Sequence, residues 1–241
     1  MYSFESRIRY SEIDYEGIIK FDAILDYYQD CSTFHSEELG VGMDVMAEWQ
    51  VAWILSSWQV VVKRYPKMGE KIKIGTWPYQ FRGFMGNRNF VMEDEEGKKI
   101  AYANSIWVLL DLTTGKPKKA MPQMLEAYQL EPQLLMNCES RKISVPKELK
   151  KYPSFPVHKY HIDTNMHVNN AKYILMAQEY LPTGFKIGQM RAEYRKAAVY
   201  GDVIYPSVSI GDEDGRITIV LANEEAKPYA VIELEKKMEQ G

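Results

Sequence analysis

Hydrophobic residues in the first half of the chain follow two different periods. Between Asp22 and Gly40 apolar residues recur every three to four positions, which is typical of a helix with one buried face. On either side, β-branched and aromatic residues that alternate with polar ones predict strands. The predicted elements are a strand at 5–14, a helix with Asp22 as its N-cap, and strands at 51–65, 71–77, 80–93 and 98–112.

This order of elements favours an antiparallel sheet with a helix on one face. One strand, one long helix and about four more strands follow each other, without the strand–helix alternation that a doubly wound parallel sheet requires. A turn at 94–97 joins two of the strands as a hairpin. The predicted fold class is therefore α+β.

The same order returns after a segment of different character. Residues 118–150 contain prolines, a short stretch at 124–130 that predicts a helix, and a basic run at 147–151, as expected of a connection. The elements predicted beyond it are a strand at 155–162, a helix from about 170 to 181, strands at 186–196, 202–210, 215–222 and 228–237, and a turn at 211–215.

Matches between the two series indicate an internal duplication. At an offset of 149, Ile13-Asp14 falls on Ile162-Asp163, and at an offset of 132, Gly69-Glu70 falls on Gly201-Asp202. Repeats of ~100 residues are too long for solenoid units, so they predict two copies of one domain. We expect an N-terminal unit at 1–117, a connecting segment at 118–150 and a C-terminal unit at 151–241.

Composition narrows the class of protein. The 241 residues are 46% hydrophobic with a net charge of -3, which fits a globular protein and argues against non-specific nucleic-acid binding. No run approaches the ~18 apolar residues of a membrane span, and no export signal is visible, so we expect a cytoplasmic protein. Cys31 and Cys138 predict neither a disulfide framework nor a zinc site, and we expect no metal or cofactor.

The segment 161–173 carries the densest polar chemistry of the chain. Asp163, Asn165 and His167 alternate with other residues, so in an extended segment their side chains would point to one face. Asn169 or Asn170 can cap the helix that follows, which places backbone N–H groups of its first turn beside those side chains. The segment therefore predicts a site at a helix N-terminus.

Only the second copy carries the whole polar set. In the first copy, Glu16 and Ile18 stand at the positions of Asn165 and His167. A structural role required of every copy would be expected in both copies. The asymmetry therefore favours one functional site per chain.

The sequence Asp-x-Asn-x-His-x-Asn-Asn at 163–170, followed by Lys-Tyr-Ile at 172–174, resembles the signature of the acyl-ACP thioesterases. Members of that family release fatty acids from acyl carrier protein (ACP). Their fold is a pair of tandem hotdog units, each a curled antiparallel sheet wrapped around one long central helix. Because the resemblance extends over nearly the whole chain, it implies this double hotdog fold and a cofactor-independent hydrolysis of fatty acyl-ACP.

Thioester hydrolysis needs an activated water, donors for the developing oxyanion and a dry tunnel for the acyl chain. We expect Asp163 and Asn165 to orient the water. His167 carries an imidazole, a group that can take or give a proton. The expected oxyanion donors are the backbone N–H groups of Val168, Asn169 and Asn170. The sequence leaves open which group is the base.

One position departs from the family pattern. The pattern has a further acid in the strand after the catalytic helix, and here that position is Ala197; plant members carry cysteine next to it, at Ala198. Glu193, about 13 Å away along a strand, is a weak substitute. Two alternatives stay open: an acyl-CoA thioesterase of the same fold and, because of Ala197, a catalytically weak module that binds acyl thioesters.

The carrier protein presents an acidic helix, so the surface of this chain that binds it must be locally basic. Arg195 and Lys196 lie beside the predicted site strand and are the expected ACP contacts. His35, His158 and His161 lack the spacing of metal ligands and are expected to be structural. Further dimerisation is common in such folds, so a homodimer is also open.

Overall fold

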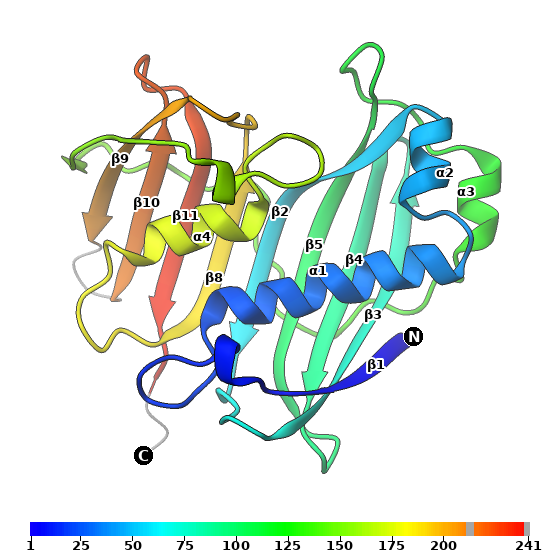
Figure 1. The fold of residues 1–241 in the computed structure, drawn as a ribbon, viewed down its shortest axis with the longest axis horizontal. Helices are drawn as coiled ribbons and strands as arrows, with labels where there is room; N and C mark the ends of the chain where they lie inside the picture. Colours follow the sequence, from blue (N-terminus) through cyan, green and yellow to red (C-terminus); the bar gives the residue numbers. More distant parts are fainter. Residues whose placement is uncertain (211–214, 239–241) are drawn as a thin grey trace. The chain divides into compact units, whose positions relative to one another are not determined.

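The computed structural model describes residues 1–210 and 215–238, so most of the turn predicted at 211–215 lies outside the described residues. The chain forms two compact units. Unit 1 comprises Met1–Ser56 and Val60–Cys138, and unit 2 comprises Ser57–Gln59 and the chain from Glu139 onward. In each unit one helix lies across one face of an antiparallel sheet (Figure 1).

The sheet of unit 1 has the strand order β1-β3-β4-β5-β2. Its strands are β1 (Tyr2–Arg7), β2 (Val51–Val62), β3 (Lys71–Arg82), β4 (Met85–Glu93) and β5 (Lys99–Asp111). Its helices are α1 (Phe21–Glu38), α2 (Met43–Glu48) and α3 (Pro122–Ala127). Strands β1 and β3, β3 and β4, and β4 and β5 pair antiparallel, with Tyr2 opposite Thr76 on β1 and β3. The strand predicted at 71–77 is longer than expected and continues to Arg82.

Helix α1 is held on the sheet by its apolar face. Ile24, Leu25 and Tyr28 are almost completely buried, and the Tyr28 ring lies 5.2 Å from the ring of Phe90 on β4. Each buried side chain of this size contributes about 1.5–3 kcal/mol relative to exposure. The prediction that Asp22 caps the helix is wrong, because the N-cap is Lys20 and Asp22 lies in the first turn.

Unit 2 repeats this arrangement with a shorter helix. The strand order is β8-β11-β10-β9-β6, with β7 also paired to β9. The elements are β6 (Lys150–Lys151), β7 (Phe155–Pro156), α4 (Asn170–Gln178), β8 (Ile187–Tyr194), β9 (Val203–Ile210), β10 (Arg216–Ala222) and β11 (Pro228–Lys236). Helix α4 contacts β10 and β11. Within the described ranges, no helix combines the length and apolarity needed to cross a membrane.

Both units begin differently from the sequence prediction. The strands predicted at 5–14 and 155–162 are cut short, and each is followed by a 3-10 helix, at Tyr10–Glu12 and Lys159–His161. In each of these helices the last side chain accepts the N–H of the residue before the helix. The backbone N–H of Arg9 donates to Glu12 Oε2 (2.8 Å), and the backbone N–H of His158 donates to His161 Nδ1 (3.0 Å). This local bond replaces strand pairing, and it gives His161 a structural role.

Backbone hydrogen bonds of the two units agree with the internal duplication. Ile8 donates to the Glu70 carbonyl (3.0 Å) in unit 1, and Val157 donates to the Asp202 carbonyl (2.8 Å) in unit 2. These pairs correspond at the two offsets that the sequence matches gave. Corresponding positions in the two units can therefore be compared directly.

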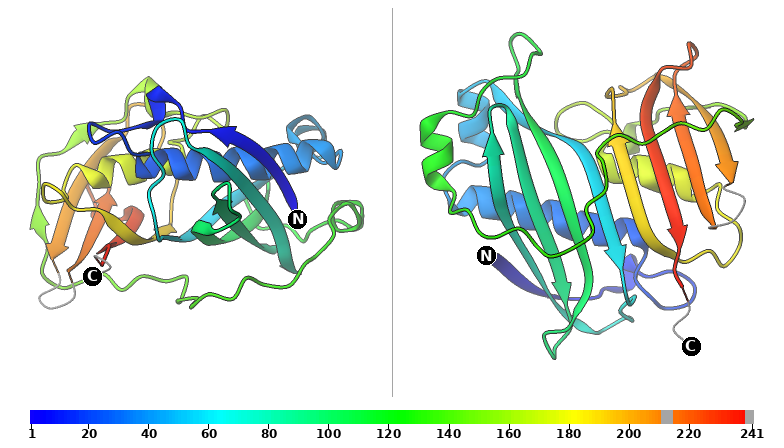
Figure 2. Two further views of the ribbon diagram at one scale, coloured as in Figure 1. Left: turned by 90° about the horizontal axis from the view of Figure 1, so that it is seen from below. Right: turned by 180° about the vertical axis from the view of Figure 1, so that it is seen from behind.

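The connection enters unit 2 across the sheet face opposite α4 (Figure 2, right). Arg191 of β8 donates to the Ser140 carbonyl (2.6 Å) and to Glu233 of β11 (2.7 Å). Glu193 of β8 accepts the N–H of Ile143 (3.0 Å). Because buried charges are tolerated when they are paired and hydrogen-bonded, these side chains fix the segment to the sheet.

We expect His35 to make the protein less stable as the pH falls from about 6.5 towards 4. Arg88, which is 8% exposed, donates to His35 Nδ1 over 3.0 Å. Burial, and then the charge of Arg88, lowers the pKa of His35 from 6.5 to about 4. As the pH falls, the unfolded chain therefore takes up this proton before the folded protein does. The stability that is fully present above pH 6.5 is lost as the pH approaches the folded-state pKa of about 4.

Denaturant unfolding of the parent and of His35→Gln at several pH values tests this prediction. The glutamine oxygen can still accept from Arg88 but does not titrate. The parent should lose more stability on acidification than the variant. Equal losses would show that His35 is not responsible.

Candidate active site

Asp163 to His167 form a tight turn in unit 2. Asp163 N–H donates to the His167 carbonyl (2.8 Å), Met166 N–H donates to the Asp163 carbonyl (3.1 Å), and Ile162 pairs with Val168 in an antiparallel bridge. The segment is therefore not extended, and the prediction that alternation places the three side chains on one face is wrong. The turn instead gathers Asp163, Asn165 and His167 within one short loop.

The first copy makes the same turn with different side chains. Asp14 N–H donates to the Ile18 carbonyl (2.9 Å), and Asp14 Oδ1 accepts the N–H of Glu16 (2.8 Å). Asp163 Oδ1 accepts the N–H of Asn165 in the same way (2.8 Å). The carboxylate of Asp163 therefore has a structural role that Asp14 shares. Side chains at the positions of Asn165 and His167 are not needed for it.

Met166 has an unusual backbone conformation within this turn. Its φ is 62°, and the corresponding residue of unit 1 is Gly17 with a φ of 77°. The left-handed region costs a residue with a side chain about 1–2 kcal/mol, and a glycine almost nothing. The Met166 side chain is 71% exposed, so burial does not offset this cost. Such strain is often found at functional sites.

The turn leads directly into the N-terminus of α4. Asn169 is the N-cap, and its Oδ1 accepts the N–H of Ala171 (2.8 Å). The N–H of Val168 donates to the Ala198 carbonyl (2.9 Å), and the N–H of Asn169 donates to the His161 carbonyl (2.9 Å). Two of the three expected oxyanion donors thus serve the fold.

Asn170 remains as the helix-terminal donor. In the described part of the chain, its N–H makes no hydrogen bond. The residue is half-buried at the first position of α4, where the helix dipole is positive. An oxyanion beside the turn would therefore meet a free N–H and a favourable dipole.

The two alanines that depart from the family pattern follow β8 and lie beside the turn. Ala197 is exposed, whereas Ala198 is fully buried. The Ala198 carbonyl accepts the N–H of Val168, and the Ala198 N–H donates to the hydroxyl of Tyr173 on α4 (2.8 Å). The position of the missing acid is thus adjacent to a residue bonded to the turn.

Glu193 does not replace that acid. It lies on the sheet face that the connection crosses, where it accepts the N–H of Ile143 and pairs with Arg195 over 2.8 Å. Burial alone would raise the pKa of Glu193, but these two partners bring it below its usual value. Its carboxylate is therefore ionised, bonded through Oε2 to Ile143 and Arg195, and directed away from the helix side of the sheet.

Asp202 is also engaged in the fold. Its Oδ2 accepts the N–H of Val199 (3.0 Å) and the hydroxyl of Tyr229 (3.2 Å). In unit 1 the corresponding Glu70 accepts the N–H of Lys67 (2.8 Å). Since both copies use this carboxylate to close the same turn, Asp202 has a structural explanation.

A duplicated helix-on-sheet unit, whose second copy carries the polar turn Asp163–His167 at a helix N-terminus, defines a double hotdog protein with one candidate site in the described residues. Residues 1–128 match the acyl-ACP thioesterase N-terminal domain, and residues 145–235 match the acyl-ACP thioesterase C-terminal domain. The chain therefore belongs to the acyl-ACP thioesterase family, as its motif predicted.

Relatives with known names are distant in sequence. The chain is 25% identical to the chloroplastic palmitoyl-acyl carrier protein thioesterase of Arabidopsis thaliana, over 78% of this chain and 50% of that protein. It is 22% identical to oleoyl-acyl carrier protein thioesterase 1 of the same plant, over 82% of this chain and 60% of that one. The chain thus spans about half the length of the curated relatives it matches.

Solved structures share the fold over nearly the whole chain. An acyl-ACP thioesterase from Bacteroides thetaiotaomicron has a TM-score of 0.88 at 21% identity, covering 98% of this chain and 97% of that one. The 12:0-ACP thioesterase from Umbellularia californica has a TM-score of 0.82 at 17% identity, covering 98% and 96%. This likeness confirms the predicted double hotdog fold.

Proposed function

We propose that the protein hydrolyses fatty acyl-ACP to a free fatty acid and ACP, as part of fatty acid biosynthesis. The observation that carries this proposal is the turn of Asp163, Asn165 and His167 at the N-terminus of α4, in a chain of this family. Relatives named as palmitoyl and oleoyl carrier-protein thioesterases support the substrate class.

The proposed reaction is attack of water on the thioester carbonyl carbon. Asp163 or His167 takes a proton from the water, and Asn165 holds the water by a hydrogen bond. The carbonyl oxygen becomes an oxyanion beside the Asn170 N–H. When the C–S bond breaks, the sulfur of the carrier's prosthetic arm leaves and takes up a proton.

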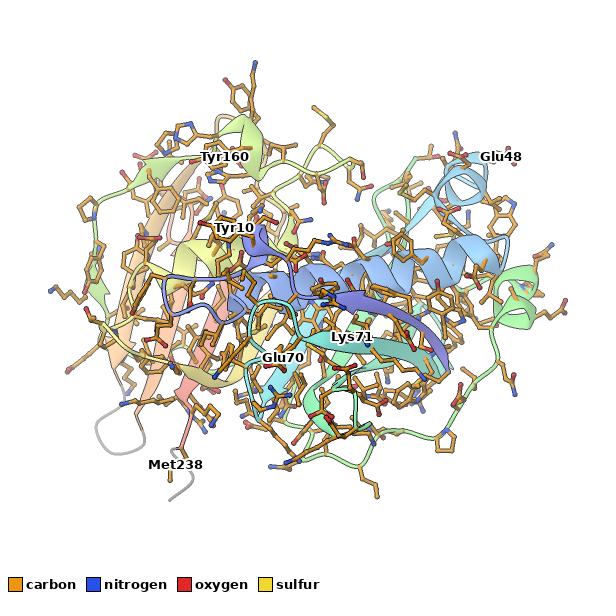
Figure 3. All side chains as sticks on the ribbon, turned by 60° about the horizontal axis from the view of Figure 1, so that its bottom comes forward. Tyr10, Glu48, Glu70, Lys71, Tyr160 and Met238 are labelled. Carbon is orange, nitrogen blue, oxygen red and sulfur yellow. The ribbon has the colours of Figure 1, made fainter. Side chains whose placement is uncertain are left out.

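The residues that we propose to bind the carrier differ from those expected from the sequence. The Arg195 guanidinium is bonded to Glu193 (2.8 Å) and to the Ile143 carbonyl (3.2 Å), so its charge is largely neutralised. Lys196 is exposed and remains the better of the two predicted contacts. We add Lys159 on the neighbouring 3-10 helix, next to Tyr160, which is 72% exposed and labelled in Figure 3.

We also propose a cytoplasmic location. Both cysteines are free, Cys31 in the core and Cys138 on the surface. An unpaired exposed thiol fits a reducing compartment.

The test is steady-state hydrolysis of acyl-ACP and acyl-CoA thioesters that carry the same acyl chains, from medium to long. We expect kcat/KM to be at least about tenfold higher for the carrier-bound thioesters, a preference of ~1.4 kcal/mol. An equal or higher value for the CoA thioesters would favour the acyl-CoA alternative. Saturable binding without turnover of either substrate would identify a silent binding module.

A further inference from the structure

Two tyrosine hydroxyls lie beside the candidate site, that of the buried Tyr173 in the Lys-Tyr-Ile part of the motif and that of the half-buried Tyr194 at the end of β8. The Tyr173 hydroxyl accepts the N–H of Ala198 (2.8 Å), and the Tyr194 hydroxyl donates to the Asn170 carbonyl (3.0 Å). The centroids of the two rings are 6.0 Å apart. Together they connect β8 and the segment after it to the first turns of α4.

The peptide of Ala198 is held from both sides. Its N–H is bonded to Tyr173 on α4, and its carbonyl accepts the N–H of Val168, the residue after His167. Ala198 is fully buried, so loss of the tyrosine hydroxyl would leave an N–H without a partner, which is costly. Tyr173 therefore links the helix to the turn through one buried peptide.

Unit 1 makes the same backbone contact without tyrosines. The N–H of Ile19 donates to the Pro66 carbonyl (3.0 Å), which corresponds to the bond from Val168 to Ala198. Proline has no N–H, so it needs no acceptor there. Ile24 stands at the position of Tyr173 and Val62 at that of Tyr194. The fold of a unit thus does not require the tyrosine pair, and only the unit with the polar turn has it.

The environment of Tyr173 keeps its hydroxyl neutral. Burial, together with the negative charges of Asp202 and Asp163, raises the pKa of Tyr173 well above its usual value, although the Ala198 N–H opposes this. The oxygen accepts from Ala198 while the hydroxyl keeps its own proton.

We propose that Tyr173 is a positioning residue for thioester hydrolysis. It fixes the Ala198 peptide, and through Val168 it fixes His167 and the start of α4 at the distances that hydrolysis needs. Tyr194 assists by holding the Asn170 carbonyl, and with it the peptide next to the free Asn170 N–H. The inference rests on the proposed function, because it concerns the same site.

Tyr173→Phe tests this inference, with Tyr27→Phe as the matched control. Tyr27 is a buried tyrosine of α1 whose hydroxyl is bonded to Glu12 (2.8 Å), in the unit without the polar turn. We expect Tyr173→Phe to lower kcat for acyl-ACP about tenfold with little change in KM, because only the geometry of the reacting groups changes. Amide hydrogen exchange of 163–170 should become faster. Tyr27→Phe should change neither measurement.

The double variant Tyr173→Phe/Ala198→Pro provides a rescue that a general packing role would not show. Proline at 198 removes the stranded N–H, as Pro66 does in unit 1, so kcat and slow exchange should return towards the parent values. Parental kcat and exchange in Tyr173→Phe, or equal losses in Tyr27→Phe, would overturn the inference. If the parent hydrolyses no acyl-ACP, the proposed function fails, and the exchange data decide the positioning role alone.

Discussion

Replacing Ala197 by glutamate is expected to raise kcat for acyl-ACP hydrolysis by about 10²-fold, the lower end of what a positioned general base contributes. The family pattern has an acid at this position. In this protein, the residue next to it, Ala198, is hydrogen-bonded to Val168 at the end of the polar turn. A carboxylate introduced at 197 would therefore arise beside Asp163 and His167.

Space favours this substitution. Ala197 is exposed, so a longer side chain displaces no packed neighbour. Glu193 is bonded to the connection on the opposite sheet face and Asp202 to the N–H of Val199, so neither competes for the water. The parent is thus expected to be a slow enzyme whose deficit one carboxylate can largely correct.

Single-turnover hydrolysis of one acyl-ACP by the parent, Ala197→Glu and Ala197→Gln measures this effect. Glutamine matches glutamate in size and hydrogen bonding but cannot act as a base. Only the glutamate variant should gain rate, and the gain should follow ionisation of the new carboxylate as the pH rises. Equal rates in the two variants would show that residue 197 does not face the reacting water.

Substitutions in the polar turn should abolish most of the activity without unfolding the protein. We expect Asn165→Ala and His167→Ala to lower kcat/KM by about 10²–10³-fold, since each removes a group placed to hold or ionise the water. Asn165 is exposed and His167 half-buried, so their truncation should change stability little. Hydrolysis and thermal unfolding of each variant check both parts of the prediction.

Asp163 needs a sharper pair of variants, because its carboxylate also closes the turn. Asp163→Asn keeps an oxygen that can accept the Asn165 N–H and removes only the charge, whereas Asp163→Ala removes both. Asp163→Asn should therefore lose activity at unchanged melting temperature, and Asp163→Ala should lose both.

The first copy supplies the control for this pair. Asp14 makes the same bond to Glu16 N–H over 2.8 Å, in a unit without the polar set. Asp14→Asn should leave hydrolysis unchanged. Full activity in Asp163→Asn, Asn165→Ala and His167→Ala would place the chemistry elsewhere.

Long elements and their order could be predicted from the sequence because burial of one face leaves a period in the chain. The apolar stripe through Ile24 and Tyr28 identified α1, and the repeated order of elements gave the double unit. Boundaries were less predictable. The 3-10 helix at Lys159–His161 depends on one bond from a backbone N–H to the His161 ring, which hydrophobic alternation does not reveal.

The motif located the candidate site but not its geometry. Asp163, Asn165 and His167 were identified by residue type and spacing, yet they lie in a turn with Met166 in the left-handed region. The expected donors Val168 and Asn169 are bonded to Ala198 and His161, which come from other parts of the unit. Such partners become visible only when distant segments meet.

By itself, the sequence determined the class of fold, the duplication and the segment that carries the polar residues, because these depend on periodicity and local spacing. Tertiary structure alone decided which N–H groups remain free, that Glu193 belongs to the opposite sheet face, and that Tyr173 holds the peptide of Ala198. The physical reason is that a hydrogen bond joins groups that are close in space, and in this protein its two partners often lie tens of residues apart in the chain.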